Sequence, residues 1–389
     1  MKPSYDFDMI PERMGTNSVK YDLIKKTGRP EDTIPLWVAD MDFPSPPEVL
    51  QALQNRIEHG IFGYSFPDEK YFDAVRNWFL KRHNWNTRFD CFLITPGVMF
   101  AISAIIRAIT EKDDGILICQ PVYYPFYNTI VDNGRKVVVC ELQEEDGRYF
   151  VDYVDFEEKI KQNDVKVFLL CSPHNPVGRV WTKEELKTMG DICLRNGVFV
   201  ISDEIHADFI FGNHTHTVFP TIRQEYEDIC AVCTSPSKTF NLAGLQIANI
   251  YIHNDEVRGK VKRELEKQSY THPNVMAMVA CQAAYMCGEK WLNDLLRYLE
   301  GNLRYLQTYV REKLPKVSIV EPQGTYLVWL DFRKCGLSDK QLKNMLINRS
   351  RIWLDDGYIF GPSASGFQRI NIACPIATLQ KALDRISLL

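Results

Sequence analysis

The stretch that decides the fold of this chain is Cys233–Gly244, which reads CTSPSKTFNLAG. An apolar, strand-like run leads into it, and the residues around Lys238 are small, polar or turn-forming. This pattern predicts that a strand ends here and that a short loop presents the lysine amine to a bound molecule. Because a single lysine is more commonly a solvated surface charge, its function depends on what the rest of the chain supplies.

Composition and charge narrow the class of protein. The chain has 389 residues, of which 45% are hydrophobic and 25% charged, so it is long enough for a substantial core and for two domains. Its 46 basic and 50 acidic side chains give a net charge of -4, without a basic stripe for nucleic acid. The start, MKPSYDFDM, lacks an apolar signal core, and no apolar run is long enough to cross a bilayer. We therefore expect a cytoplasmic protein without nucleic-acid or membrane partners.

The cysteines and histidines do not predict a metal site. Most of the eleven cysteines lie in apolar runs, which is typical of reduced, buried thiols. The single C-x-x-C motif, Cys230 to Cys233, has no second pair at zinc-binding spacing. His214 and His216 have no matching cluster of ligands, so a polar loop is the simpler interpretation.

Short apolar runs alternate with helical patterns through the middle of the chain. The runs that read as strands are 93–95, 115–119, 136–142, 165–171, 198–202, 229–234 and 247–252. Thr182 and Glu185 form a capping-box pattern at the start of one intervening helix. Near-continuous apolar strands separated by helices predict an α/β fold with a mainly parallel sheet covered on both faces. Ligands are then expected beyond the carboxyl ends of the strands.

The two ends of the chain read differently from its middle. Residues 1–45 look irregular and are rich in proline, aspartate and aromatic residues, so we expect an arm that packs on the small domain. Residues 46–288 form the predicted large domain, and residues 289–389 a smaller α+β domain that opens with a long amphipathic helix. The loop 355–365 is either a cover over the substrate or a plain exposed loop.

Polar residues follow successive predicted strands, and together they suggest a cofactor. Gly97, Tyr123, Asn175, Asp203 and Lys238 each have an ordinary explanation, such as a turn, a packed ring or a helix cap. The chain has neither G-x-G-x-x-G after its first strand nor G-x-x-x-x-G-K-[ST], so dinucleotide and nucleotide-triphosphate sites lack their glycine loops. Pyridoxal 5'-phosphate needs a helix start for its phosphate, a stacking ring, a hydrogen-bond donor, a carboxylate and a lysine.

Six motifs resemble one enzyme family across nearly the whole chain. They are WVADMDF at 37–43, SPHNPVGRVW at 172–181, SDEIH at 202–206, SPSKTFNLAGLQ at 235–246, PQGTYLVWLDF at 322–332 and RINIAC at 369–374. In this combination they resemble the fold type I pyridoxal-phosphate enzymes. Within the class I/II aminotransferase family, the likeness is to the MalY/PatB-like subgroup of cystathionine beta-lyases and cysteine C-S lyases.

The resemblance implies a role for each residue around the cofactor ring. Lys238 is expected to bind the cofactor covalently and then to move the substrate's α-proton. Asp203 is expected to keep the pyridine nitrogen protonated, and a shift of about two pKa units there corresponds to roughly 3 kcal/mol. Asn175 is expected to hydrogen-bond the phenolic oxygen and Tyr123 to stack on the ring.

The resemblance also implies how the phosphate is held. The helix that starts at Gly97 is expected to offer the backbone N-H groups of Val98 and Met99. Ser235 is expected to add a hydroxyl, and Tyr64 is expected to reach the phosphate from a second copy of the chain. Each active site is therefore expected to be completed in a homodimer.

The substrate is expected to be a small amino acid. Arg369 is expected to clamp its α-carboxylate in a bidentate fork, with Ala39, Tyr123 and Tyr64 lining the substrate site.

Two positions depart from the aminotransferase pattern. His206 stands where aminotransferases often carry a tyrosine, and we expect it to lie beside the cofactor without a proton-transfer role. Gln246 stands where they often carry an arginine that binds the phosphate. Both departures fit the lyase subgroup.

The expected reaction is a β-elimination. A cysteine S-conjugate such as L-cystathionine would give a thiol, pyruvate and ammonia. An aminotransferase remains an alternative, since it would share every cofactor residue. A cofactor-binding regulatory protein on the same scaffold is a second alternative, which the retention of Lys238, Asp203 and Arg369 disfavours.

Overall fold

A seven-stranded sheet organises the larger part of the molecule. The computed structural model describes residues 5–387. In sheet order the strands are β2 (Phe92–Thr95), β10 (Ala248–Ile252), β9 (Cys230–Thr234), β8 (Phe199–Asp203), β7 (Val165–Cys171), β3 (Gly115–Gln120) and β4 (Lys136–Glu141). Only β10 runs antiparallel to its two neighbours, and the other pairings are parallel. The predicted mainly parallel α/β sheet is confirmed.

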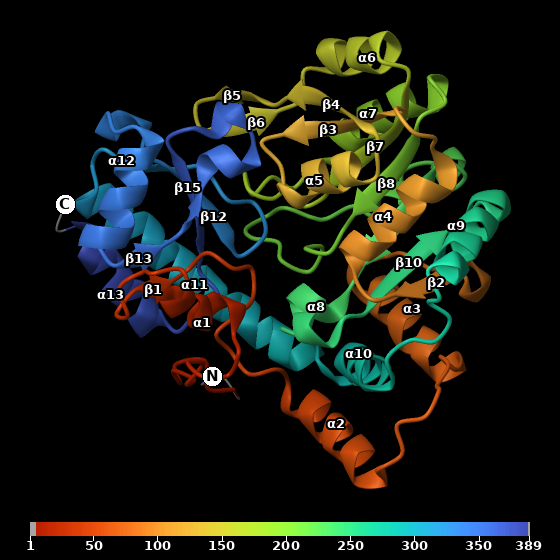
Figure 1. The fold of residues 1–389 in the computed structure, drawn as a ribbon, viewed down its shortest axis with the longest axis horizontal. Coiled ribbons are helices and arrows are strands. Elements are labelled where there is room, and N and C mark those ends of the chain that lie inside the picture. Colours follow the sequence, from red (N-terminus) through yellow and green to blue (C-terminus); the bar gives the residue numbers. More distant parts are fainter. Residues whose placement is uncertain (1–4, 388–389) are drawn as a thin grey trace.

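The sheet is buried on both faces because its strands carry apolar residues at successive positions. On β3, Ile116 and Ile118 join one core cluster, while Leu117 and Cys119 join the other. The first cluster includes α4 (Val98–Ile109), α5 (Pro125–Asp132) and α9 (Asp255–Lys267). The second includes α3 (Glu69–His83), α6 (Tyr153–Gln162), α7 (Lys183–Arg195) and α10 (Val275–Cys287). Figure 1 shows these helices around the sheet.

A local sequence signal sets the start of α7 as expected. The capping box is confirmed at α7, where Glu185 N donates to Thr182 Oγ1 at 3.1 Å and Thr182 N donates to Glu185 Oε2 at 2.8 Å. Directly after β4, the edge strand of the large sheet, β5 (Gln143–Glu145) and β6 (Arg148–Phe150) form a short hairpin.

A second, antiparallel sheet occupies the C-terminal part of the chain. Its order is β11 (Ser318–Ile319), β12 (Leu327–Asp331), β15 (Phe367–Asn371) and β14 (Asp355–Asp356), and it is accompanied by α11 (Glu289–Lys313), α12 (Asp339–Asn344) and α13 (Ile376–Ser387). The expectation of one continuous loop over 355–365 is wrong at its start. Asp355 pairs with Arg369 across the sheet, so the first two residues of that loop are a strand.

The N-terminal arm is more regular than its composition predicted. It contains the helix α1 (Val19–Lys26), capped by Ser18, and the strand β1 (Ile34–Pro35). Strand β1 pairs in parallel with β13 (Ile352–Trp353), which places the arm beside the C-terminal elements (Figure 1). The expectation of an irregular arm is therefore wrong, because tertiary pairing orders a polar segment that shows little apolar periodicity.

Candidate active site

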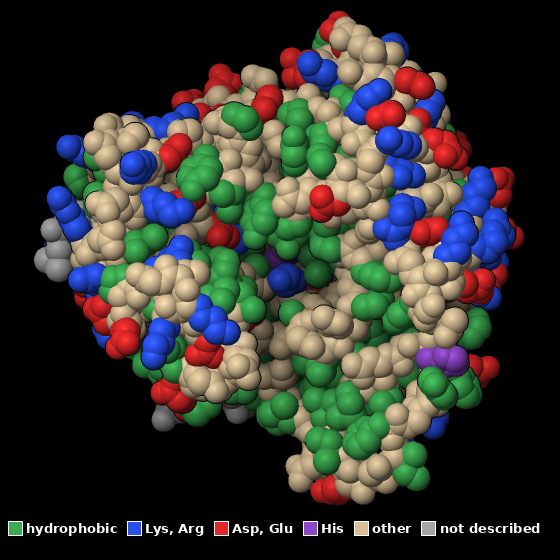
Figure 2. All heavy atoms as spheres, in the orientation of Figure 1, with side chains coloured by type: hydrophobic (Ala, Val, Ile, Leu, Met, Phe, Trp, Pro, Cys, Tyr) green, Lys and Arg blue, Asp and Glu red, His purple; other side chains and the backbone are tan. Residues whose placement is uncertain are grey.

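A cavity of about 400 Å³ lies at the carboxyl ends of the large sheet's strands. Nine predicted site residues border it, namely Ala39, Gly97, Val98, Met99, Tyr123, Asn175, Asp203, His206 and Lys238. Figure 2 shows a hollow near the middle of the visible face, with basic side-chain atoms at its bottom. Residues that converge here come from segments as distant as 39 and 246, as expected for a site at the carboxyl edge of a parallel sheet.

Lys238 sits on a one-turn helix, α8 (Pro236–Thr239), directly after β9. Its Nζ donates a hydrogen bond to the carbonyl oxygen of Ala39 at 2.7 Å. The pKa of Lys238 is lowered to about 8, mainly by burial and also by the charge of Arg369, while Asp40 and Asp203 act in the opposite direction. A substantial fraction of the amine is therefore neutral near pH 7 to 8, which a nucleophile or base requires.

Asp203 ends β8 and is the buried acid of the cavity. Burial raises its pKa to about 7, although the N-H of Ile205, which donates to Oδ1 at 3.1 Å, and the nearby Lys238 both lower it. A carboxylate held in such a place costs free energy unless a cation or hydrogen-bond donor meets it. The position therefore suits a positively charged ring nitrogen.

Arg369 lies on β15, is 3% exposed, and connects the C-terminal sheet to the cavity. Its Nη1 donates to Asn175 Oδ1 at 3.0 Å and its Nη2 to the carbonyl of Trp37 at 2.9 Å. It also forms a buried ion pair with Asp355, whose pKa is raised by burial against the effect of the guanidinium. Arg369 Nε is buried and meets no hydrogen-bond partner among the described residues.

The segment Trp37–Met41 runs through the site and is fixed by its backbone carbonyls. Besides the contact of Arg369 with Trp37, Asn371 Nδ2 donates to the carbonyl of Val38 at 2.7 Å. The hydroxyl of Tyr326 donates to the carbonyl of Ala39 at 3.0 Å, beside the amine of Lys238. The WVADM sequence therefore links Lys238 to residues of the C-terminal sheet.

The N-terminus of α4 forms the anion-attracting side of the cavity. Gly97 precedes the helix with no side-chain cap, so the backbone N-H groups of Val98 and Met99 stay available. Gln246 borders the same cavity and adds no charge. The helix dipole and free N-H groups favour a phosphate here.

Ser235 and Ser237 lie in different surroundings, although only Ser235 was expected at the phosphate. Ser235 Oγ donates to the carbonyl of Ile247 at 2.7 Å and accepts from Ser237 N, so this hydroxyl caps α8. Ser237, and not Ser235, borders the cavity. The sequence reasoning missed Ser237 and Ile205, although both are immediate neighbours of residues that it singled out, in SPSK and DEIH.

His206 is a buried, neutral member of the cavity wall. Burial, followed by Lys238 and Arg369, lowers its pKa well below the usual value. Its ring lies 5.8 Å from that of Tyr326, and its Nδ1 has no partner among the described residues. This nitrogen is available to a ligand, which is compatible with the expected position beside the cofactor.

Tyr64 lies away from the cavity of its own chain. It belongs to the segment between α2 (Pro47–His59) and α3, it is 93% exposed, and its ring lies 5.1 Å from that of His272. Of the predicted site residues, Tyr64, Ser235 and Arg369 do not border the cavity itself.

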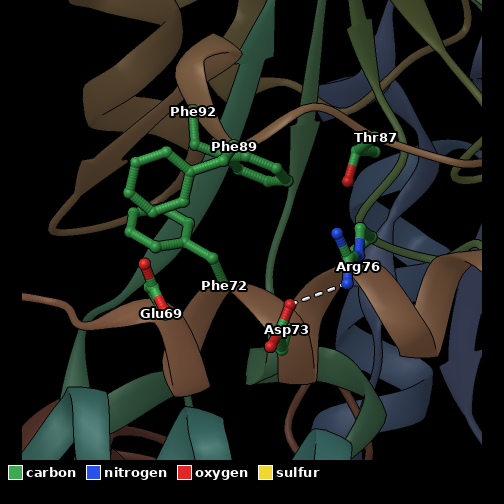
Figure 3. A pocket seen from close by; sticks show the side chains of 7 residues that line it. All are labelled: Glu69, Phe72, Asp73, Arg76, Thr87, Phe89 and Phe92. Carbon is green, nitrogen blue, oxygen red and sulfur yellow. Dashed lines mark ion pairs between the residues drawn. The ribbon is translucent and has the colours of Figure 1, made fainter.

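A separate hollow lies on the outside of the molecule, beside α3 and β2 (Figure 3). Phe72, Phe89 and Phe92 form one wall, and Asp73 pairs with Arg76 at 2.8 Å on the other. It contains none of the predicted site residues, and its ion pair is well exposed to solvent. Within residues 5–387 no cluster of histidine, cysteine or acidic side chains could hold a metal ion.

The molecule is an α/β protein in which a buried lysine, Lys238, and a buried acid, Asp203, line one cavity at the carboxyl edge of the sheet. The chain belongs to the aminotransferase class I and II family, which it matches over residues 31–386. The class I/II membership expected from the motifs is confirmed.

Relatives that it resembles over nearly their whole length include members of the expected subgroup. The chain is 42% identical over 381 residues to cystathionine beta-lyase PatB of Bacillus subtilis strain 168, covering 98% of both proteins. It is 34% identical over 382 residues to protein MalY of Escherichia coli K12, covering 97% of both. The crystal structure of cystalysin from Treponema denticola, which contains pyridoxal 5'-phosphate, has a TM-score of 0.96 at 36% identity and covers 99% of this chain and 98% of that one. Within the described residues, no helix is both long and apolar enough to span a membrane.

Proposed function

We propose that this enzyme is a pyridoxal-phosphate-dependent carbon-sulfur lyase. It splits L-cysteine S-conjugates such as L-cystathionine by β-elimination, and with water the products are a thiol, pyruvate and ammonia. The observation that carries the proposal is the buried pair of Lys238 and Asp203 facing one cavity beside a free helix N-terminus. The names of the lyase relatives support elimination over transamination.

The residues present fit this cofactor by their chemistry. Asp203 is a buried acid that lacks a full counter-charge, which suits a protonated pyridine nitrogen. The N-H groups of Val98 and Met99 suit the phosphate, and Tyr123 supplies a ring at the cavity wall. Lys238 supplies the amine for the aldehyde, and Asn175 or the unpartnered Nδ1 of His206 can meet the phenolic oxygen.

Different residues of the chain would then carry out the separate steps of the reaction. When bound, the cofactor withdraws electrons from the substrate's α-carbon. Lys238, released as a neutral amine, takes the α-proton, which its depressed pKa permits near neutral pH. Arg369, which lies behind the cavity wall, is the candidate to hold the α-carboxylate, and Asn175 fixes its guanidinium. Once the α-proton is removed, the carbon-sulfur bond breaks and its electron pair leaves with the thiolate.

A product assay tests this function directly. The purified enzyme with L-cystathionine or S-alkyl cysteines is expected to release thiol and pyruvate in equal amounts, without an added keto acid. With L-cystine, the expected sulfur product that accompanies pyruvate is the persulfide thiocysteine. The parallel reaction contains an amino acid and 2-oxoglutarate. Turnover that requires the keto acid and releases no thiol would overturn the lyase proposal in favour of the aminotransferase.

We also propose that a homodimer completes each site through Tyr64 of the second copy. Five exposed apolar side chains gather on α2 and the segment after it, namely Leu50, Ile57, Ile61, Phe62 and Phe66. Figure 2 shows hydrophobic side chains over this lower lobe. Such a patch is typical of a protein interface. Specific activity is expected to fall on dilution together with the dimer fraction measured by sedimentation, and full activity in a monomer would contradict the shared site.

A cytoplasmic location is proposed on the state of the cysteines. All eleven are free, and nine of them are buried. Free thiols in this number are typical of a reducing compartment.

A further inference from the structure

Behind the cavity lies a cluster of buried acids and histidines that does not border it. Glu204 Oε2 lies 2.7 Å from His216 Nε2, and Asp208 Oδ1 lies 3.0 Å from His83 Nε2. The two histidine rings meet edge to face with their centroids 5.5 Å apart. The loop that carries Glu204 and Asp208 leaves directly from Asp203, so the cluster is continuous with the cofactor-facing residues.

Asp208 is the most highly connected member of this cluster. It is 7% exposed, and besides His83 it accepts hydrogen bonds from Trp78 Nε1 at 3.2 Å and Arg82 Nε at 3.2 Å. All three of these donors lie on α3. Its fourth donor is Thr239 Oγ1, at 2.8 Å, which comes from the residue after Lys238. The carboxylate of Asp208 therefore links α3, through hydrogen bonds, to the segment that carries Lys238.

The charge of Asp208 is stable in this environment. Burial by itself would raise its pKa, but the hydrogen bond with His83 and the charge of Arg82 lower it below the usual value. The ionised form is therefore favoured, and it is a strong acceptor for the Thr239 hydroxyl.

Helix α8 needs such an anchor, because a helix of four residues is not stable on its own. Thr239 is 1% exposed, and the next residue, Phe240, packs its ring 5.3 Å from that of Trp78. Thr239 is linked to α3 through Asp208, whereas Phe240 contacts Trp78 of α3 directly, and none of these residues is part of the cavity lining. The backbone at Lys238 is therefore fixed by its C-terminal neighbours.

We propose that Asp208 is a positioning residue for Lys238 that acts through the hydroxyl of Thr239. The inference rests on the proposed function, in which Lys238 carries the cofactor and moves the proton. Asp208 touches neither cofactor nor substrate. It sets the direction from which the lysine amine approaches the substrate's α-carbon, a geometry on which proton transfer depends steeply.

The test compares Thr239→Val with Thr239→Ser in the holoenzyme. Valine keeps the size of threonine but removes the donor to Asp208, which retains its three donors on α3. Thr239→Val is expected to lower kcat about tenfold, with KM changed less than about twofold. The pH midpoint of the visible absorbance of the lysine-bound cofactor is expected to shift as well. Thr239→Ser keeps the hydroxyl and is expected to restore both values, even if both variants melt at a lower temperature.

A double-variant cycle identifies Asp208 as the residue through which the effect passes. In an Asp208→Asn background, Thr239→Val is expected to change kcat by less than its effect in the wild type. Equal kcat and equal absorbance midpoints in the valine and serine variants would overturn the proposal, as would fully additive effects in the cycle. A wild-type enzyme without lysine-bound cofactor absorbance would contradict the proposed function instead, so the two failures are distinguishable.

Discussion

Replacing Lys238 with alanine is expected to abolish the visible absorbance of the lysine-bound cofactor and to lower β-elimination by at least about 10⁴-fold. Among residues 5–387 no other lysine borders the cavity, and the buried Lys20 is held by Asp42 at 2.8 Å on the arm. No second amine can therefore replace the nucleophile or the base. Absorbance spectra and thiol release measure the two losses separately.

A matched lysine on the surface provides the control. Lys81 leaves 67% of its side chain exposed and pairs with Glu289, so Lys81→Ala is expected to keep both absorbance and turnover. The Lys238→Ala fold is expected to remain intact, because burial disfavours the charged amine that is removed. Elimination above about one hundredth of the wild-type rate would contradict the assignment of Lys238 as the base.

The large sheet could be predicted from sequence because its signals are local. Each central strand is an apolar run that ends at a polar or turn-forming residue, as β8 does at Asp203. The start of α7 is encoded by Thr182 and Glu185 alone. Strand ends then give the position of the site, because parallel strands bring their carboxyl ends to one edge.

Features that depend on long-range pairing could not be predicted. Strand β14 has two residues and no periodicity, and it exists because Asp355 faces Arg369 across the sheet. Helix α1 is polar, and the clearest local sign of it is the cap at Ser18. Neither has enough local preference to be recognised without its partner.

Within the site, residue types were easier to predict than orientations. Ser235 and Ser237 are equivalent in the sequence SPSK, and only the turn of α8 decides that Ser237 borders the cavity. Thr239 gave no signal at all, because its partner Asp208 lies 31 positions away along the chain. Contacts among the residues behind a site depend on the three-dimensional fold and leave no pattern in the local sequence.

Replacing Asp203 with asparagine is expected to lower kcat/KM by about a hundredfold. The amide is close in size to the carboxylate but cannot hold a proton on the pyridine nitrogen. Lowering the pKa of that nitrogen by about two units corresponds to about 3 kcal/mol. Thiol-release kinetics on the cofactor-saturated variant measure this effect. Wild-type kinetics in Asp203→Asn would show that the ring nitrogen does not depend on this acid.

The same substitution has a pH signature in the cofactor-free chain. The pKa of Asp203 is about 7 in the folded chain and about 3.9 when unfolded, so between these values the folded chain holds a proton that the unfolded chain has lost. The contribution of Asp203 to the free energy of unfolding is therefore fully present below about pH 4. It is lost as the pH rises toward 7, by up to about 1.4 kcal/mol per pH unit. The free energy of unfolding of the wild type, minus that of Asp203→Asn, is therefore expected to fall between pH 4.5 and 7 and to level off above pH 8. Urea unfolding of both chains measures this difference. Parallel pH profiles would contradict the burial argument, whereas a slope that disappears when pyridoxal 5'-phosphate is added would identify the cofactor as the missing cation.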